Sequence, residues 1–139
     1  MRRAIGVIIG VVATAIVAVL GASTAQAAVR YDIYVKTCNV NNAGTDANVQ
    51  GKLFGANGET GWVVLDLPID DRERGHTDHY TFDLADVGPI SAISLSYDHS
   101  GGSPDWCLDN VVIEGPHGVT THPFHNWLTS ATTITLVAF

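Results

Sequence analysis

The stretch that decides the fold class is residues 29–36, VRYDIYVK. Every second side chain in it is apolar: Val29, Tyr31, Ile33 and Val35. This period of two is typical of a strand that buries one face, because successive side chains of a strand point to opposite sides. The sequence therefore predicts a half-buried strand here.

Seven more extended segments follow, separated by stretches rich in turn-forming Gly, Pro, Asn and Asp. They cover residues 47–54, 62–67, 80–84, 93–97, 106–114, 122–128 and 132–139. No segment after residue 27 has the apolar period of a helix. We therefore expect an all-β fold, an antiparallel β-sandwich, with Trp106 and Trp127 packed in its core.

The first 27 residues have the three parts of a Sec signal peptide. A basic start, Met1-Arg2-Arg3, precedes an apolar run over residues 4–20, and the small-residue triplet Ala25-Gln26-Ala27 follows. We expect cleavage near Ala27, secretion to the extracellular space and a single mature domain at residues 28–139. The alternative is a retained membrane anchor, for which the apolar run is short.

The expected mature domain is acidic. The chain has 7 Lys+Arg and 14 Asp+Glu residues. Since Arg2 and Arg3 lie in the expected signal peptide, five basic residues face 14 acidic ones, a formal net charge of −9. This charge argues against nucleic acid as a partner, because little basic charge remains to neutralise a phosphate backbone. Attraction to an anionic membrane would need a bridging cation, which points to metal ions.

The domain contains two cysteines, Cys38 and Cys107. In an exported protein, a disulfide between them is the simplest outcome. It would close a loop of about 70 residues and contribute about 4 kcal/mol in the chain-entropy model. The alternative, a cysteine nucleophile served by a histidine, suits an exporting compartment poorly.

Six pieces of the mature sequence stand out in order: residues 31–37 (YDIYVKT), 43–49 (AGTDANV), 74–82 (RGHTDHYTF), 97–101 (YDHSG), 104–111 (PDWCLDNV) and 124–128 (FHNWL). Together they resemble the PLAT/LH2 domain family. The resemblance implies a sandwich of two four-stranded sheets. It also implies a module that docks lipid surfaces or protein partners in lipoxygenases, lipases and bacterial phospholipase toxins, where catalysis belongs to a separate domain. The chain resembles a stand-alone PLAT domain.

The resemblance further implies calcium-binding loops at one end of the sandwich. The turn at residues 42–45 matches a loop whose first side chain and whose Gly and Thr carbonyls ligate the ion. The second metal loop matches residues 66–71, and a residue just before Trp106 would complete the first site. The implied ligands are Asn42, Gly44, Thr45, Asp66, Asp70, Asp71 and Asp105.

The chemistry of these residues agrees with calcium, which takes six to eight oxygen ligands from carboxylates, amides and carbonyls. Asn42 stands where the family often has Asp, and its neutral amide coordinates less strongly. The alternative is that the aspartates of residues 66–71 only cap turns on a solvated loop, with Arg72 and Arg74 as local counter-charges.

Three further features bear on function. Trp62 follows the turn at residues 58–61, so it either inserts into a lipid interface or is half-buried against a neighbouring strand. The pairs His76/His79 and His122/His125 have a spacing seen in zinc sites, but residues three apart in a strand face opposite sides. We expect surface and loop histidines. The chain lacks a Gly-x-Ser-x-Gly elbow, and we expect no enzyme activity.

Together these observations predict a secreted, monomeric, non-catalytic binding module that engages a lipid or membrane surface, or a protein partner, with calcium. One alternative is a module that binds a secreted protein partner, with calcium purely structural. Another is an accessory subunit of a separately encoded secreted lipase, which rests on analogy with the family.

Overall fold

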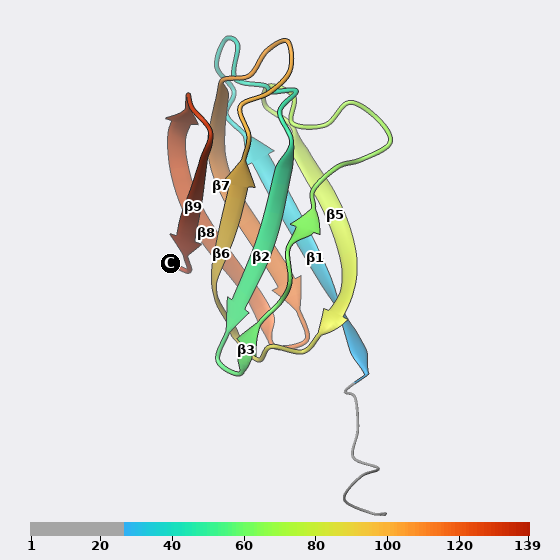
Figure 1. Ribbon diagram of the computed structural model, residues 1–139. Coiled ribbons are helices and arrows are strands. Elements are labelled where there is room, and N and C mark those ends of the chain that lie inside the picture. The colour runs from blue at the N-terminus through green and yellow to red at the C-terminus, as the bar shows by residue number, and fades with distance from the viewer. Residues whose placement is uncertain (1–26) are drawn as a thin grey trace, which may run out of the picture.

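The structure is a computed structural model that describes residues 27–139, so the expected signal peptide lies outside these residues except for Ala27. The described residues form nine strands (Figure 1): β1 (Ala28–Thr37), β2 (Val49–Gly55), β3 (Gly58–Glu59), β4 (Val63–Val64), β5 (Thr77–Ala85), β6 (Ile90–Tyr97), β7 (Trp106–Gly115), β8 (Gly118–Leu128) and β9 (Thr132–Val137). Within this part of the chain there is no helix long and apolar enough to cross a membrane.

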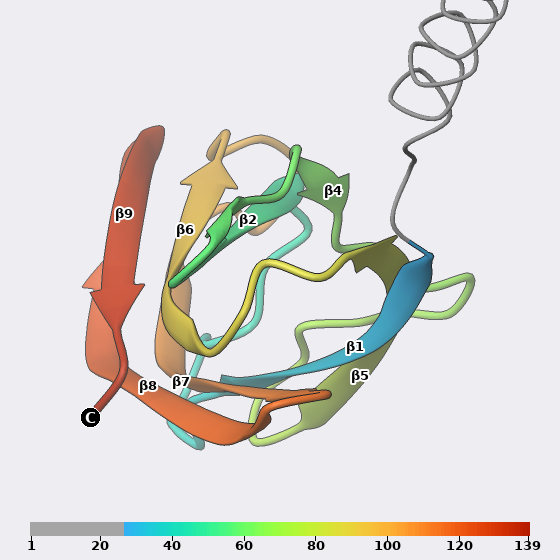
Figure 2. The ribbon, with the colours of Figure 1, turned by 90° about the horizontal axis from the view of Figure 1, so that it is seen from below.

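The strands form two antiparallel sheets packed face to face (Figure 2), which confirms the predicted sandwich. The first sheet has the order β5-β1-β7-β8, and the second has the order β3-β2-β6-β9, with β4 also paired to β2. The short strands β3 and β4 pair with opposite ends of the same edge of β2, through Gly55↔Gly58 and Gln50↔Val64. One edge position is therefore shared by two strands, and the second sheet has five strands where four were expected.

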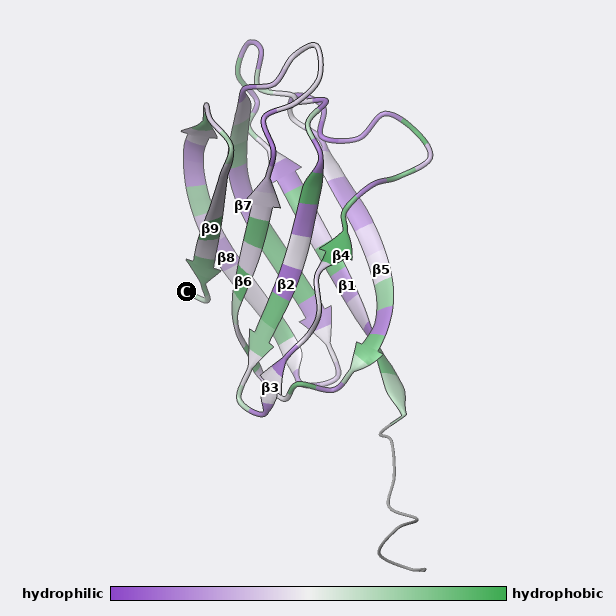
Figure 3. Ribbon diagram, viewed as in Figure 1, coloured by the Kyte–Doolittle hydropathy of each residue, from purple (hydrophilic) through white to green (hydrophobic). Residues whose placement is uncertain are grey.

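The core follows from the alternation in β1. Tyr31, Ile33 and Val35 are at most 1% exposed, while their neighbours face outward, and Figure 3 shows hydrophilic and hydrophobic bands along the strands. Trp106 is fully buried and donates its indole N–H to Thr37 Oγ1 at 3.0 Å, so the predicted core position is confirmed.

The prediction that Trp127 belongs to the core is wrong, because 39% of this residue is exposed. Its neighbour Leu128, which is 5% exposed, pairs with Trp106 and takes the inward-facing place on β8. Since successive strand residues face opposite sides, the side chain of Trp127 lies on the outer face.

Three long loops meet at one end of the sandwich, at the top of Figure 1: residues 38–48, 65–76 and 98–105. The predicted disulfide between Cys38 and Cys107 is confirmed, with a Cα–Cα distance of 5.4 Å. It joins the end of β1 to the start of β7, and Cys38 N–H also donates to the Cys107 carbonyl at 2.9 Å. This crosslink anchors the end where the loops meet.

The sheets also join along one side, where β8 lies next to β9 (Figure 2). His122 of β8 is fully buried there, and its Nδ1 lies 2.9 Å from the Leu136 carbonyl of β9. Because a carbonyl only accepts hydrogen bonds, Nδ1 carries a proton and donates. Its Nε2 lies 2.8 Å from Thr120 Oγ1. The ring thus links the two sheets.

We expect His122 to make the domain less stable in acid. Burial lowers its pKa from the ordinary value of 6.5, so the folded state favours the neutral ring. Its contribution is fully present above the unfolded pKa of about 6.5 and is lost as the pH falls below that value. Between about pH 7.5 and about pH 5, the unfolding free energy in urea should fall more in the wild type than in His122→Asn. Equal falls would contradict this role.

Candidate functional site

The loop end contains a hollow of about 430 Å³. It is lined by Asn42, Ala43, Gly44, Thr45, Asp46, Asp70, Glu73, Arg74 and Ser103. Three of these residues carry carboxylates and one carries an exposed amide, so the lining is rich in oxygen. The three long loops together hold seven of the chain's 14 acidic residues. The hollow therefore lies in an acidic part of the described chain.

The loop of residues 38–48 is held in place by bonds to the loop that precedes β7. Thr45 Oγ1 donates to the Pro104 carbonyl at 2.7 Å, and Cys107 N–H donates to the Ala43 carbonyl at 3.0 Å. Asn42 adopts the left-handed conformation with a φ of 60°, which turns the chain sharply at the rim of the hollow. The first predicted metal loop is thus rigidly positioned.

Gly44 allows the loops at residues 38–48 and 65–76 to approach closely. A Cβ at this position would lie 2.8 Å from the Arg72 carbonyl oxygen and 3.1 Å from Glu73 Oε2. The Arg72 carbonyl also accepts the Thr45 N–H at 3.1 Å. The missing side chain therefore brings the Glu73 carboxylate against the backbone of the first loop.

The loop of residues 65–76 is built around the buried side chain of Arg72, which is 4% exposed. Its Nη1 donates to the Leu65 carbonyl at 2.5 Å and to Asp71 Oδ2 at 2.9 Å, and its Nη2 donates to the Ala47 carbonyl at 2.9 Å. These bonds connect the loop to the loop of residues 38–48 and to its own start. Because Arg72 has a φ of 56°, its side chain leaves the loop toward the core while the loop turns around it.

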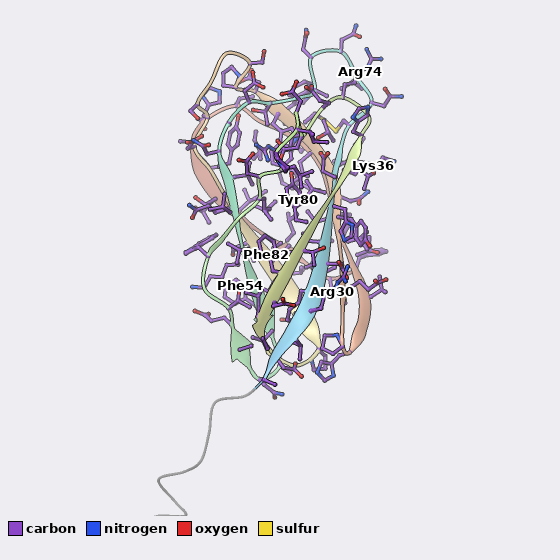
Figure 4. The ribbon with its side chains drawn as sticks, turned by 90° about the vertical axis from the view of Figure 1, so that its right-hand side faces the viewer. Arg30, Lys36, Phe54, Arg74, Tyr80 and Phe82 are labelled. Carbon is purple, nitrogen blue, oxygen red and sulfur yellow. A yellow bond between two sulfur atoms is a disulfide. The ribbon has the colours of Figure 1, made fainter. Side chains whose placement is uncertain are left out.

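Tyr80 completes this buried network from β5 (Figure 4). Its hydroxyl donates to Asp71 Oδ2 at 2.8 Å and accepts from Arg72 Nη1 at 3.2 Å. Burial, together with the hydrogen bond to Asp71, raises the pKa of the Tyr80 phenol far above its usual range. The hydroxyl therefore stays protonated as a donor.

The predicted metal residues separate into two groups. The hollow brings together Asn42, Gly44, Thr45 and Asp70. Asp105 lies beside it, in a smaller hollow of about 240 Å³ that shares Asn42 and Ser103 with the first. These residues come from all three long loops.

Asp66 and Asp71 do not line the hollow. Asp66 is exposed, whereas Asp71 is 9% exposed and its Oδ2 already accepts three hydrogen bonds, including one from Leu67 N–H at 3.1 Å. Since that carboxylate is paired with Arg72, it serves the loop's own structure. This geometry agrees with the alternative interpretation, in which Asp71 stabilises a turn and Arg72 is its counter-charge.

Two carboxylates of the hollow, Asp46 and Glu73, were missed in the sequence. Asp46 directly follows the matched Gly-Thr pair, and Glu73 lies between two arginines. Glu73 looks like part of an exposed charge run unless the burial of Arg72 is known. In the sequence, only their position close to the predicted ligands indicated that they belong to the same hollow.

The third loop is ordered by Asp98. Its Oδ1 accepts from Asn48 N–H at 2.9 Å and from Ser100 Oγ at 2.7 Å, and these hydrogen bonds lower the pKa of the Asp98 carboxyl to about 2. At the other side of this loop, His99 Nε2 lies 2.6 Å from Asp105 Oδ1. The loop therefore presents Asp105 next to the hollow in a fixed arrangement.

Trp62 lies away from the hollow. It precedes β4, whose Val63 pairs with Gly51, so it stands beside the middle of β2. The residue is 43% exposed, and Lys52 Nζ lies 5.7 Å from its ring centroid. The structure thus places the predicted lipid-contacting residue on the side of the sandwich, outside the calcium loops.

In comparison with known protein families, the description of the PLAT/LH2 domain matches residues 31–139. The chain belongs to the PLAT/LH2 domain family. The match spans all strands described except the start of β1, so the resemblance inferred from the sequence is confirmed.

Curated relatives of this PLAT domain are much longer proteins. It is 37% identical over 101 residues to Lipoxygenase homology domain-containing protein 1 of Mus musculus, a match that covers 71% of this chain and 5% of the relative. It is 38% identical over 87 residues to the Allene oxide synthase-lipoxygenase protein of Plexaura homomalla, covering 60% of this chain and 8% of the relative. The chain thus spans a small fraction of these relatives.

Solved structures similar to this PLAT domain include two lipoxygenases. A coral 8R-lipoxygenase, described as activated by calcium via a C2-like domain, aligns with a TM-score of 0.71 and 32% identity over 78% of this chain and 17% of that one. A calcium-dependent 11R-lipoxygenase aligns with a TM-score of 0.64 and 33% identity over 79% and 17%. The alpha toxin of Clostridium absonum aligns at 0.67 with 21% identity over 83% and 33%, which shows the shared fold alone.

We expect Arg72→Met to destabilise the PLAT domain by about 3 to 5 kcal/mol, because it leaves the buried Asp71 carboxylate unpaired. Urea denaturation of the variant measures this loss. Arg74→Met is the matched control, since Arg74 is exposed and bonds the exposed side chains of Asn39 and Asn41. A loss in Arg72→Met no greater than in the control would show that the network does not support the fold.

Proposed function

We propose that this chain is a secreted, non-catalytic PLAT module that binds calcium at the loop end and docks on a lipid surface through it. One observation carries the proposal: the hollow gathers Asn42, Asp70 and Glu73 around the Gly44-Thr45 backbone. Secretion rests on the signal-peptide pattern of residues 1–27. The absence of catalysis rests on the sequence, which offers no catalytic motif.

The donor set of the hollow fits calcium. Asp46, Asp70 and Glu73 offer carboxylate oxygens and Asn42 offers an amide oxygen, all hard ligands of the kind calcium selects. Asp70 and Asn42 are exposed, so they can turn toward an ion at little cost. Arg74 also lines the hollow, but its Nη1 donates to Asn41 Oδ1 at 2.6 Å and its charge is directed to that neighbouring loop. The two lipoxygenases similar in structure are described as calcium-activated or calcium-dependent.

When bound, calcium supplies positive charge to an otherwise acidic surface. An anionic lipid headgroup is repelled by the seven carboxylates of the three loops, and the ion reverses this locally and can bridge to phosphate. The chain's own residues hold the ion at the tip of the sandwich, where it is accessible to a flat surface. Binding to lipid should therefore depend on calcium.

Two apolar side chains at the same end support contact with lipid. Ile69 is 71% exposed and directly precedes Asp70, and Val40 is 44% exposed in the loop that carries Asn42. Such side chains gain free energy by entering the interfacial region of a bilayer. We propose Ile69 as the main inserted side chain and retain Trp62 as a second contact, which requires the domain to tilt onto its side.

Sedimentation of the chain with vesicles tests the function. Neutral and anionic vesicles are compared in calcium and in chelator. Binding that requires both calcium and anionic lipid supports the proposal. An absence of binding in every condition would overturn lipid docking and favour a secreted protein partner, with calcium purely structural.

We expect the double variant Asp70→Asn with Glu73→Gln to lose most of the stabilisation that calcium gives the wild type. At a calcium concentration about 100 times the dissociation constant, one site adds about 2.7 kcal/mol. Thermal melting with calcium and with chelator measures this difference. Asp83→Asn removes an exposed carboxylate from β5 and serves as the control, since Asp83 does not line the hollow. A full calcium response in the double variant would rule out this ligand set.

We expect Ile69→Ser to weaken vesicle binding about ten- to a hundredfold, since burying an isoleucine side chain is worth about 1.5 to 3 kcal/mol. The same measurement on Trp62→Ser shows whether the side of the sandwich also touches lipid. If only the tryptophan variant loses affinity, the loop end is not the docking surface. Neither variant removes a proposed calcium ligand, so their melting response to calcium should equal that of the wild type.

A further inference from the structure

The disulfide has two potential metal ligands beside it. One donor atom each from Cys38, Asp109 and His125 all lie within 4.8 Å of one another. Cys107 Sγ is bonded to Cys38 Sγ, so a second sulfur lies next to this group. Two sulfurs, one carboxylate and one imidazole thus gather where β1 ends and β7 begins, apart from the oxygen-lined hollow.

A β-bulge brings His125 into this group. Leu108 pairs with Asn126 while Asn110 pairs with Pro123, so Phe124 and His125 together oppose the single residue Asp109. His125 has a φ of 48°, and its Nδ1 lies 2.7 Å from Asp109 Oδ1. The bulge therefore turns the imidazole out of the usual alternation and toward the carboxylate, while the ring stays accessible with a side-chain exposure of 78%.

His122, three residues earlier, is buried and bonded to Leu136, so the sequence pair His122/His125 does not converge on a metal. His125 meets cysteine and aspartate from other strands, which the spacing along the chain could not show.

We propose that Cys38, Cys107, Asp109 and His125 bind one zinc ion when the disulfide is reduced, so that the ion replaces the disulfide as the crosslink between β1 and β7. Cysteine, histidine and carboxylate are the ligands that zinc takes, in a tetrahedron with Zn–S of about 2.3 Å and Zn–N of about 2.0 Å. Those lengths put sulfur and nitrogen roughly 3.5 Å apart. The donor atoms of Cys38, Asp109 and His125 already lie within 4.8 Å of one another, and the exposed His125 ring can rotate to bring them closer. Cys107 Sγ is freed from Cys38 Sγ by reduction and starts at bonding distance from it.

Reduction converts the disulfide into the two thiolates that bind zinc, and oxidation reverses this change. A dithiol, acting through one thiolate, attacks a sulfur of the disulfide and breaks the S–S bond, and its second thiol resolves the mixed disulfide. Two electrons pass to the cysteine sulfurs while the dithiol becomes a disulfide. Zinc then binds both thiolates, and the two thiol protons pass to solvent. Removal of the same two electrons by a disulfide oxidant reforms the bond and releases the ion.

The positive charge of Lys36 would balance the net charge of the zinc-bound site. Two thiolates, one carboxylate and a zinc dication leave one net negative charge, and Lys36 Nζ lies 3.8 Å from Asp109 Oδ2. Figure 4 shows Lys36 on β1 toward the loop end of the sandwich. Because its ammonium approaches one carboxylate oxygen, the other, which faces His125, can serve the metal.

Zinc titration of the full chain in both redox states tests the proposal. A phosphine reductant is used in place of a dithiol, so that no free thiol competes for the metal. We expect the reduced chain to bind one zinc ion and the oxidised chain to bind none at this site. Cobalt substituted for zinc should give thiolate-to-metal charge-transfer absorption together with visible bands of a tetrahedral ion, and near-ultraviolet circular dichroism should show the native fold in the zinc-bound state.

Two variants distinguish zinc binding at the folded site from zinc binding by two thiols of an unfolded chain. His125→Ala and Asp109→Asn should each weaken zinc binding by at least about tenfold, since even the loss of a residue that only supports a ligand costs about 10- to 100-fold. His79→Ala is the control, because His79 forms a comparable pair with Asp32 at 2.7 Å elsewhere on the sheet. Equal zinc affinity in all four chains, or a zinc-bound reduced chain without the native fold, would overturn the proposal.

Discussion

The guanidinium of Arg72 is the constraint on which the loop end depends. It is almost completely buried, and it bonds the carbonyls of Leu65 and Ala47, the carboxylate of Asp71 and the hydroxyl of Tyr80. A buried charge is tolerated only when it is paired and hydrogen-bonded, so the surrounding loops must adopt the conformation that supplies these acceptors. The buried hydrogen bonds of Arg72 therefore fix the conformation of the loops, and this also fixes the backbone on their solvent-facing side.

The hollow is the outer side of this network. The Arg72 carbonyl accepts the Thr45 N–H, Gly44 leaves room for Glu73, and Asp70 extends from the adjoining turn. Asp46, Asp70 and Glu73 line this hollow, and the proposed dication would offset their negative charge. The buried pair thus fixes the loops that line the proposed calcium site. The disulfide fixes the neighbouring loop from the other side and makes the same end of the sandwich rigid.

Much of the fold could be predicted from the sequence because its causes are local. The alternation of residues 29–36 reflects a strand with one buried face, and the two cysteines had a single partner each. Four of the predicted metal ligands, Asn42, Gly44, Thr45 and Asp70, line one hollow, and their binding of calcium stays a prediction. Asp71 could not be told from Asp70 without knowing that Tyr80 and Arg72 face it from the core. The outward turns of Trp127 and His125 follow from β8, whose pairing with β7 is a tertiary property.

The central claim is that Arg72 and Asp71 stay paired while the residues around them hold calcium. A crystal structure of the chain grown with calcium, with the ion located by anomalous scattering, tests it most directly. The account predicts an ion in the hollow, ligated by Asp70 and Glu73, with the Arg72–Asp71 pair intact. An ion ligated by Asp71 with that pair broken, or an ion bound only outside the hollow, would contradict it.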